Sequence, residues 1–93
     1  MVIGLCRVSL SIPGSRTLKE KRRVLESLKV RLRKTFNISL AEVGRQEEWS
    51  RCDLAIVCVS SSRRYADGLL AKVINYLDEE GESTLLEYQT ELL

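Results

Sequence analysis

The feature that most constrains the fold is a change in hydrophobic period, from two to about 3.6, that occurs twice along the chain. Residues 2–12 alternate between an apolar side and a mixed side, which is typical of a strand with one buried face. The apolar side carries Val2, Cys6, Val8, Leu10 and Ile12. After a turn at residues 13–16, apolar residues recur at helical spacing, and they are Leu18, Leu25, Leu28, Leu32 and Phe36. Thr17 and Glu20 have the spacing of a capping box at the start of this helix.

The second half of the chain repeats this pattern with one extra strand. Strands are expected at residues 38–44, 51–60 and 84–92, and a second apolar helical stripe runs from Ala66 to Leu77. The order strand–helix–strand–strand–helix–strand, with right-handed crossovers, predicts a four-stranded antiparallel sheet of order 4-1-3-2 with both helices on one face. The sequence therefore predicts a ferredoxin-like α+β fold.

Length and composition limit the classes of function. We expect the 93 residues to form a single domain, residues 1–93. No apolar run reaches about 18 residues and no signal-peptide pattern is present, so we expect a cytoplasmic protein that does not contact membranes. The three cysteines, with no histidine in the chain, exclude a Cys/His zinc site, and the usual nucleotide-binding loops are absent. We therefore expect no metal, no cofactor and no enzymatic activity, because the commonest general base is also missing.

Basic residues are concentrated in the first predicted helix. Residues 16–34 contain nine basic and two acidic residues, whereas the rest of the chain contains six basic and eleven acidic ones. Cations in the first turns of a helix oppose its dipole, at a cost of roughly 0.3–1 kcal/mol each. We expect this helix to contact the phosphates of RNA or of a ribosomal particle, through Lys19, Lys21, Arg22, Arg23, Lys29 and Arg33. The alternative is neutralisation by the protein itself, because the topology puts the acidic loop at residues 78–82 near the basic start of the helix.

A second candidate anion site lies at the start of the second helix. Hydroxyl groups, cations and free backbone N–H groups coincide there. The candidate residues are Ser61, Ser62, Arg63 and Arg64. The alternative is an ordinary helix cap followed by solvated arginines.

The face of the predicted sheet that no helix covers is mainly aliphatic. Because it carries no aromatic residue, we do not expect it to stack bases. We expect a homodimer formed by stacking two such faces, and the candidate residues are Ile3, Leu5, Val43, Val57 and Val59. The alternatives are a protein–protein adaptor that uses this face and an exposed face with no partner.

A few single residues carry further expectations. Trp49, in the polar loop at residues 45–50, is either a core residue or an interface anchor, and we expect the first. Phe36, Tyr76 and Tyr88 are also expected in the core. Glu42 is expected to form a structural ion pair, with Arg7 and Arg51 as the candidate partners.

The chain resembles the YlxP-like family, a bacterial family of unknown function. The resemblance rests on a series of short motifs in a fixed order, of which Leu-Lys-Glu-Lys-Arg-Arg at residues 18–23 is the most specific. The other motifs are Pro13-Gly14, Phe36-Asn37, Ala-Glu-Val-Gly at residues 41–44, Trp49 and Val59-Ser60. The resemblance implies a ferredoxin-like fold, a bacterial cytoplasmic protein and no established catalytic residues. Members of the family are often encoded beside translation-initiation and ribosome-maturation factors, which implies a role related to RNA or the ribosome.

Overall fold

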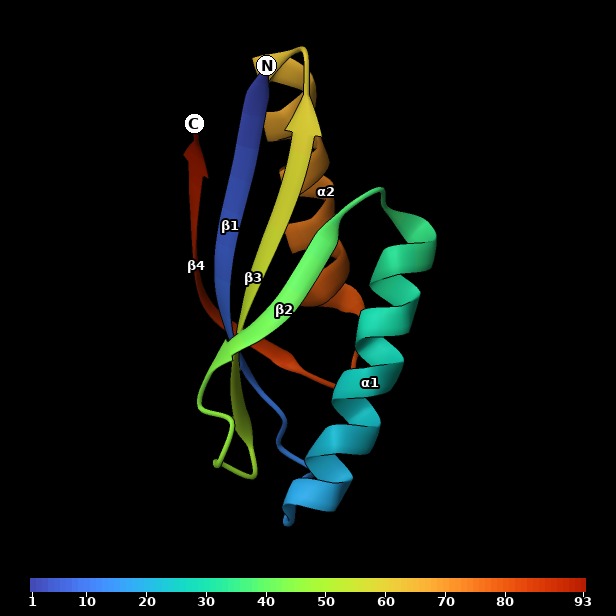
Figure 1. Ribbon diagram of the computed structural model, residues 1–93. Helices are drawn as coiled ribbons and strands as arrows, with labels where there is room; N and C mark the ends of the chain where they lie inside the picture. The colour runs from blue at the N-terminus through green and yellow to red at the C-terminus, as the bar shows by residue number, and fades with distance from the viewer.

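The chain forms two layers, a four-stranded sheet and a pair of helices (Figure 1). The computed structural model describes all 93 residues. Its elements are β1 (Val2–Ser11), α1 (Leu18–Thr35), β2 (Ser39–Gly44), β3 (Arg51–Ser60), α2 (Arg63–Glu79) and β4 (Thr84–Leu92). The strands are antiparallel in the order β2-β3-β1-β4, which is the predicted order read from the other edge. The βαββαβ arrangement is that of a ferredoxin-like fold, as predicted.

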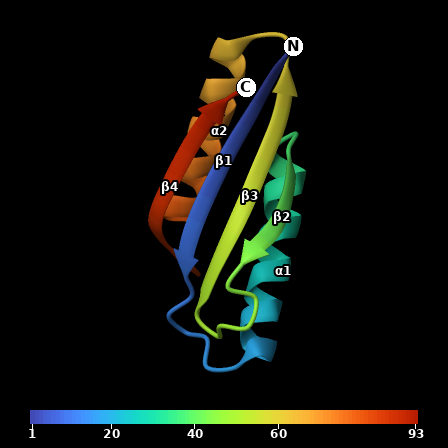
Figure 2. The same ribbon diagram turned by 60° about the vertical axis from the view of Figure 1, so that its left-hand side comes forward.

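Both helices lie on the same side of the sheet, and the other side is left uncovered (Figures 1 and 2). The alternation predicted for β1 and β3 is confirmed, because their inward side chains are buried with the inward residues of the helices in one core of 18 apolar residues. We call the uncovered side the open face. Neither helix combines the length and the apolar character that a bilayer crossing requires.

The helix ends follow the capping residues in the sequence. The hydroxyl of Thr17 accepts a hydrogen bond from the backbone N–H of Glu20 at 3.1 Å. The Glu20 carboxylate accepts a hydrogen bond from the N–H of Arg16 at 2.6 Å. A capping box predicts the N–H of Thr17 instead, one residue later. Ser62 caps α2 by accepting from the N–H of Tyr65, and Gly81 follows the helix with a φ of 94°. At this φ a residue without Cβ is favoured, which explains why the helix ends there.

The three cysteines are buried in the core and none of them forms a disulfide. Burial raises the pKa of the Cys52 thiol to about 11 and also raises that of Cys6. The thiols of Cys6 and Cys52 are therefore protonated at neutral pH and act as small apolar side chains.

The expectation of a buried Tyr88 is wrong. Tyr88 pairs with Val8, so it points toward the helix side of the sheet, but its side chain is exposed. β4 is an edge strand whose inner side α2 covers only in part, and most of its residues are exposed. The Tyr88 side chain is therefore exposed because β4 is at the edge of the sheet, although the side chain points toward the helices.

The two helices are offset along the strands, with α1 displaced toward the β2–β3 hairpin (Figures 1 and 2). Because of this offset, the end of α2 meets the second half of α1. The guanidinium of Arg31 contacts Glu80 at 3.3 Å, Glu82 at 3.6 Å and the Tyr76 hydroxyl at 3.4 Å. The acidic loop therefore neutralises Arg31 and not the basic start of α1, so the alternative that the sequence left open, neutralisation by the protein itself, holds for only part of the helix.

Candidate nucleic-acid interface

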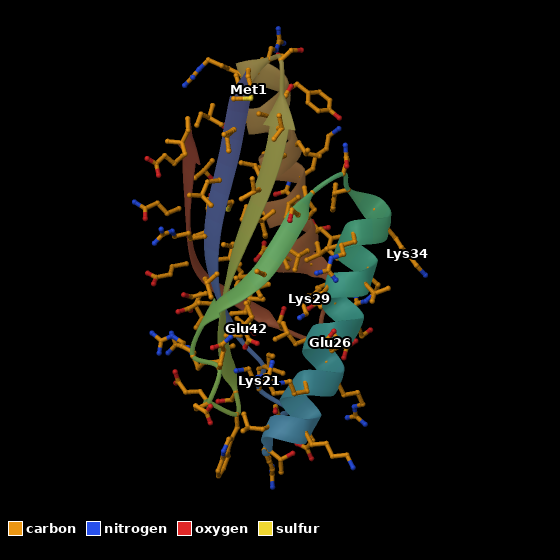
Figure 3. All side chains as sticks on the ribbon, in the orientation of Figure 1. Met1, Lys21, Glu26, Lys29, Lys34 and Glu42 are labelled. Carbon is orange, nitrogen blue, oxygen red and sulfur yellow. The ribbon has the colours of Figure 1, made fainter.

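Lys21 is not part of an accessible basic surface, and its prediction as a phosphate contact is wrong. Its side chain is 0% exposed. The ammonium Nζ lies 3.3 Å from Oε2 of Glu42 and donates a hydrogen bond to the Arg45 carbonyl at 2.7 Å. Figure 3 shows Lys21 extending from α1 toward β2, which carries Glu42. Lys21 precedes Leu25 by four residues and therefore belongs to the buried stripe of the helix.

Glu42 binds a second cation from the same helix. Its Oε1 lies 2.6 Å from NH1 of Arg22, and its own side chain is only 5% exposed. Arg22 also reaches the Gln46 carbonyl at 3.5 Å, so its charge is committed to the protein itself. The expected ion pair at Glu42 is confirmed, but its predicted partners are wrong. Glu42 points to the helix side of the sheet, whereas Arg7 lies on the open face, so the sheet separates them.

Lys29 is also engaged within the protein. Its ammonium lies 2.9 Å from the carboxylate of Glu26, one turn earlier on α1, and its side chain is 14% exposed. The hydrogen bond from Lys29 lowers the pKa of Glu26. Together with Lys21, Arg22 and Arg31, Lys29 completes a group of four basic residues of α1 that have carboxylate partners.

The other basic residues of this segment have no carboxylate within 4.0 Å. We call them the outer row, and they are Arg16, Lys19, Arg23, Arg33 and Lys34. The four that lie on the helix fall within about 100° of its circumference, on the side away from the buried stripe. Lys34 follows Lys19 by fifteen positions, which corresponds to about 22 Å along the helix axis.

The outer row lacks three of the predicted residues and contains two that were not predicted. Lys19, Arg23 and Arg33 were predicted as candidates and are exposed. Arg33 donates one long hydrogen bond, 3.4 Å, to the Leu40 carbonyl of β2. Arg16 and Lys34 were not among the candidates, although both belong to the same charged segment; Figure 3 shows Lys34 pointing away from the sheet. A helical wheel of the segment identifies Lys34, because it lies close to Arg23 in angle.

The start of α2 has the form of an ordinary cap. The Ser62 hydroxyl binds the N–H of Tyr65, and the Ser60 hydroxyl accepts from the N–H of Ser62 at 3.0 Å. Arg63 and Arg64 are exposed and have no carboxylate partner. A shallow hollow of about 380 Å³ reaches this helix end, with Ser62, Arg64, Tyr65 and Lys72 among its lining residues. No buried polar side chain points into it, so the anion site at Ser61, Ser62, Arg63 and Arg64 stays a prediction.

The open face carries the predicted aliphatic residues. The antiparallel register pairs Ile3 with Val59 and Leu5 with Val57 on this face, and Val59 is 65% exposed. Leu93 extends the patch past β4, because its backbone exchanges two hydrogen bonds with Ile3, of 2.8 and 3.0 Å. No helix covers this face (Figure 2).

One end of the open face is polar and hollow. Both edge strands, β2 and β4, have a bulge near Asp53 of β3. Asp53 itself pairs with Ser9 of β1 and Gly44 of β2. A hollow of about 500 Å³ lies there, lined mainly by Arg7, Ser9, Val43, Asp53, Glu87 and Gln89. The Ser9 hydroxyl donates to Asp53 at 2.7 Å, and Arg45 contacts the same carboxylate oxygen at 3.3 Å. The aliphatic patch is therefore bounded by a polar rim.

Trp49 is not in the core, contrary to the expectation. It is 59% exposed. The connection between β2 and β3 projects beyond the sheet, at the end where α1 begins (Figures 1 and 2), so its side chains have no core to enter. The alternative, that Trp49 is an interface anchor, stays open.

Comparison with known proteins places the chain in a family. The model of the family described as "Protein of unknown function (DUF503)" matches residues 3–90. The chain is also 36% identical over 77 residues to "Uncharacterized protein YlxP" of Bacillus subtilis (strain 168), and the match covers 83% of this chain and 84% of that protein. The resemblance found in the sequence motifs is thereby confirmed, and the chain belongs to the DUF503, or YlxP-like, family.

Proposed function

We propose that this protein is a non-enzymatic RNA-binding module whose outer row contacts the phosphates of an RNA or of a ribosomal particle. One observation carries the proposal. No carboxylate lies within 4.0 Å of the outer row, whereas Lys21, Arg22, Lys29 and Arg31 each have a carboxylate partner. The proposal implies a cytoplasmic protein, since its ligand is there.

The position of Lys19 supports the proposal. Lys19 is the second residue of α1 and lies in its first turn, where the helix dipole disfavours positive charge. An acidic residue at this position would make the helix more stable. A ligand that carries negative charge gives Lys19 a role that folding does not.

A double charge reversal tests the proposal. Lys19→Glu with Arg23→Glu is expected to weaken binding to a structured RNA in low salt about tenfold or more, because two phosphate contacts become repulsive. The fold is expected to stay intact, since neither residue has a carboxylate partner and an acid is favoured at the position of Lys19, in the first turn of α1.

The matched control is Ala71→Glu with Lys72→Glu and Asn75→Glu, which changes the net charge by the same amount at exposed positions of α2. We expect this control to weaken binding much less. Equal losses in the two variants would contradict the proposal, because they would indicate attraction by overall charge alone.

A second candidate function, favoured by the uncovered aliphatic patch, is self-association through the open face. Strands of ten, six, ten and nine residues give the face a flat footprint of about 550 Å². The accessible area of a corrugated surface exceeds its footprint, so two stacked faces approach the roughly 800 Å² per partner of a standard interface. A second copy offers the same patch and the same polar rim, which suits a two-fold axis.

The two candidate functions are compatible. The outer row lies on the side of α1 away from the sheet, and the open face lies on the far side of the sheet from both helices (Figure 1). A dimer of this kind leaves both outer rows exposed. It therefore presents two phosphate-binding surfaces, which increases affinity for a long RNA.

A further inference from the structure

Trp49 is the only tryptophan in the chain, and its ring lies mostly in solvent. Aromatic rings of this size normally contribute to stability by burial. An exposed one on a connecting segment contributes little to folding and is available to a partner.

The segment that carries Trp49 is held in one conformation from both sides. The buried ammonium of Lys21 binds the Arg45 carbonyl at 2.7 Å, and the N–H of Ile12 donates to the Ser50 carbonyl at 2.7 Å. Arg45 has a φ of 60°, the left-handed region that non-glycine residues rarely adopt. Contacts from α1 and from the end of β1 therefore fix the backbone on either side of Trp49.

The same hairpin adjoins the cationic end of α1. Lys21 and Arg22 reach from the first two turns of the helix to the Arg45 and Gln46 carbonyls. Figures 1 and 2 both show the hairpin at the end of the molecule where α1 begins. Arg16, Lys19 and Arg23, the first half of the outer row, belong to this end. Of the two acids just before Trp49, Glu48 is paired with Arg45 at 3.1 Å, and only Glu47 has no cation within 4.0 Å.

An exposed aromatic ring at the same end of the molecule as cations that have no carboxylate partner matches the chemistry of unpaired nucleic acid. The bases of a duplex are stacked on one another, whereas an unpaired base has a free face that stacks on an aromatic side chain. We infer that Trp49 stacks on an unpaired base while Arg16, Lys19 and Arg23 bind the adjoining phosphates. The inference rests on the proposed function and adds the class of ligand, an RNA with a single-stranded, looped or bulged segment.

The single tryptophan makes a direct test possible. The full-length protein is titrated in low salt with an unstructured RNA of about twelve nucleotides, enough for one binding site, and with a duplex of the same length. Tryptophan fluorescence and the anisotropy of labelled RNA are both recorded. We expect the single strand to quench the fluorescence and the duplex to leave it nearly unchanged.

The variant Trp49→Ala is expected to lose about 5- to 150-fold in affinity for the single strand and to bind the duplex as before, whereas Trp49→Phe keeps most of the affinity. Because Trp49 is exposed, the variant is expected to fold normally, which thermal unfolding checks. Tyr88→Ala is the matched control, since Tyr88 is also an exposed aromatic but lies on the edge strand β4. It is expected to change neither affinity.

The outcomes separate the inference from the proposed function. If the protein binds RNA but Trp49→Ala binds the single strand as tightly as the wild type does, the inference is wrong and the proposed function stands. The remaining role for Trp49 would then be contact with a protein partner. If the wild type binds neither RNA in low salt, the proposed function is wrong and the inference is wrong with it.

Discussion

Lys21 and Glu42 form a buried ion pair that joins α1 to β2, with Nζ and Oε2 3.3 Å apart. Lys21 lies in the most basic part of the sequence, residues 16–34, and its pairing with Glu42 shows that part of this charge is structural. Glu42 also holds Arg22, and Lys21 also holds the Arg45 carbonyl, so one cluster fixes the helix, the edge strand and the hairpin. The charges left outside the cluster form the outer row.

Removing the buried ammonium is expected to destabilise the fold. Lys21→Met keeps the apolar stem but leaves Oε2 of Glu42 without its cation, and breaking a buried pair in this way costs about 3 kcal/mol. Arg22 still pairs with Oε1 of Glu42, so we expect the loss of stability to stay below the upper end of the range for a broken buried pair. Urea denaturation measures the change. Lys19→Met, the matched control on the exposed side of the same helix, is expected to change stability by less than about 0.5 kcal/mol.

A second variant distinguishes a buried pair from simple loss of packing. Lys21→Met with Glu42→Leu is expected to recover much of the lost stability, because the buried carboxylate is removed as well. A double variant as unstable as Lys21→Met alone would contradict the role assigned to the pair.

The fold could be predicted because each element has a clear period. The alternation in β1 and β3 and the leucine stripe of α1 are local patterns, and they identify the strand faces and the helix side that pack together. The open face could be predicted for the same reason, since it is the other half of the alternation. The position of Tyr88 could not, because exposure at an edge strand depends on how far α2 extends over it.

The candidate site could be predicted only in part. Lys21 has the spacing of the buried stripe relative to Leu25, so the signal was present, but a lysine is rarely buried without a partner. The partner, Glu42, comes from a different element, and no local pattern links the two. The exposure of Trp49 depends on the same cluster, because Lys21 holds the hairpin through the Arg45 carbonyl. Contacts between distant segments therefore decide which charges and rings are free.

Self-association through the open face predicts a dimer in solution. Light scattering across micromolar to millimolar concentrations is expected to show a dimer that Val59→Lys converts to a monomer, since it places a charge in the apolar patch. Val30→Lys is the matched control, because Val30 is an exposed valine on α1, away from this face. A wild-type protein that stays monomeric over the whole range would rule out the dimer.

The buried thiol of Cys52 predicts a loss of stability in alkali. Burial raises its pKa from 9.0 to about 11, so between these values the unfolded thiol ionises while the folded one stays protonated. The unfolded state then binds fewer protons, and stability falls as pH rises through this window, by about 1.4 kcal/mol between about pH 8 and pH 10. Below pH 9 the contribution of Cys52 is fully present.

Comparison of unfolding free energies with those of Cys52→Ala isolates this effect. The substitution leaves a small cavity that lowers stability at every pH, so only the slope is informative. The wild type is expected to lose more stability than the variant over the window. Parallel slopes would mean that Cys52 ionises in the folded protein as it does in the unfolded chain.

The dependence of RNA affinity on salt tests the central claim most directly, because each phosphate neutralised by a cation contributes about −0.7 to −0.9 to the slope of log affinity against log salt. With the five cations of the outer row engaged, the wild type is expected to have a slope of about −3.5 to −4.5. Lys19→Glu with Arg23→Glu is expected to reduce its magnitude by about 1.4 to 1.8, as two phosphate contacts are lost. A wild-type slope near zero, or the same slope in the variant, would contradict the claim that the outer row binds phosphates.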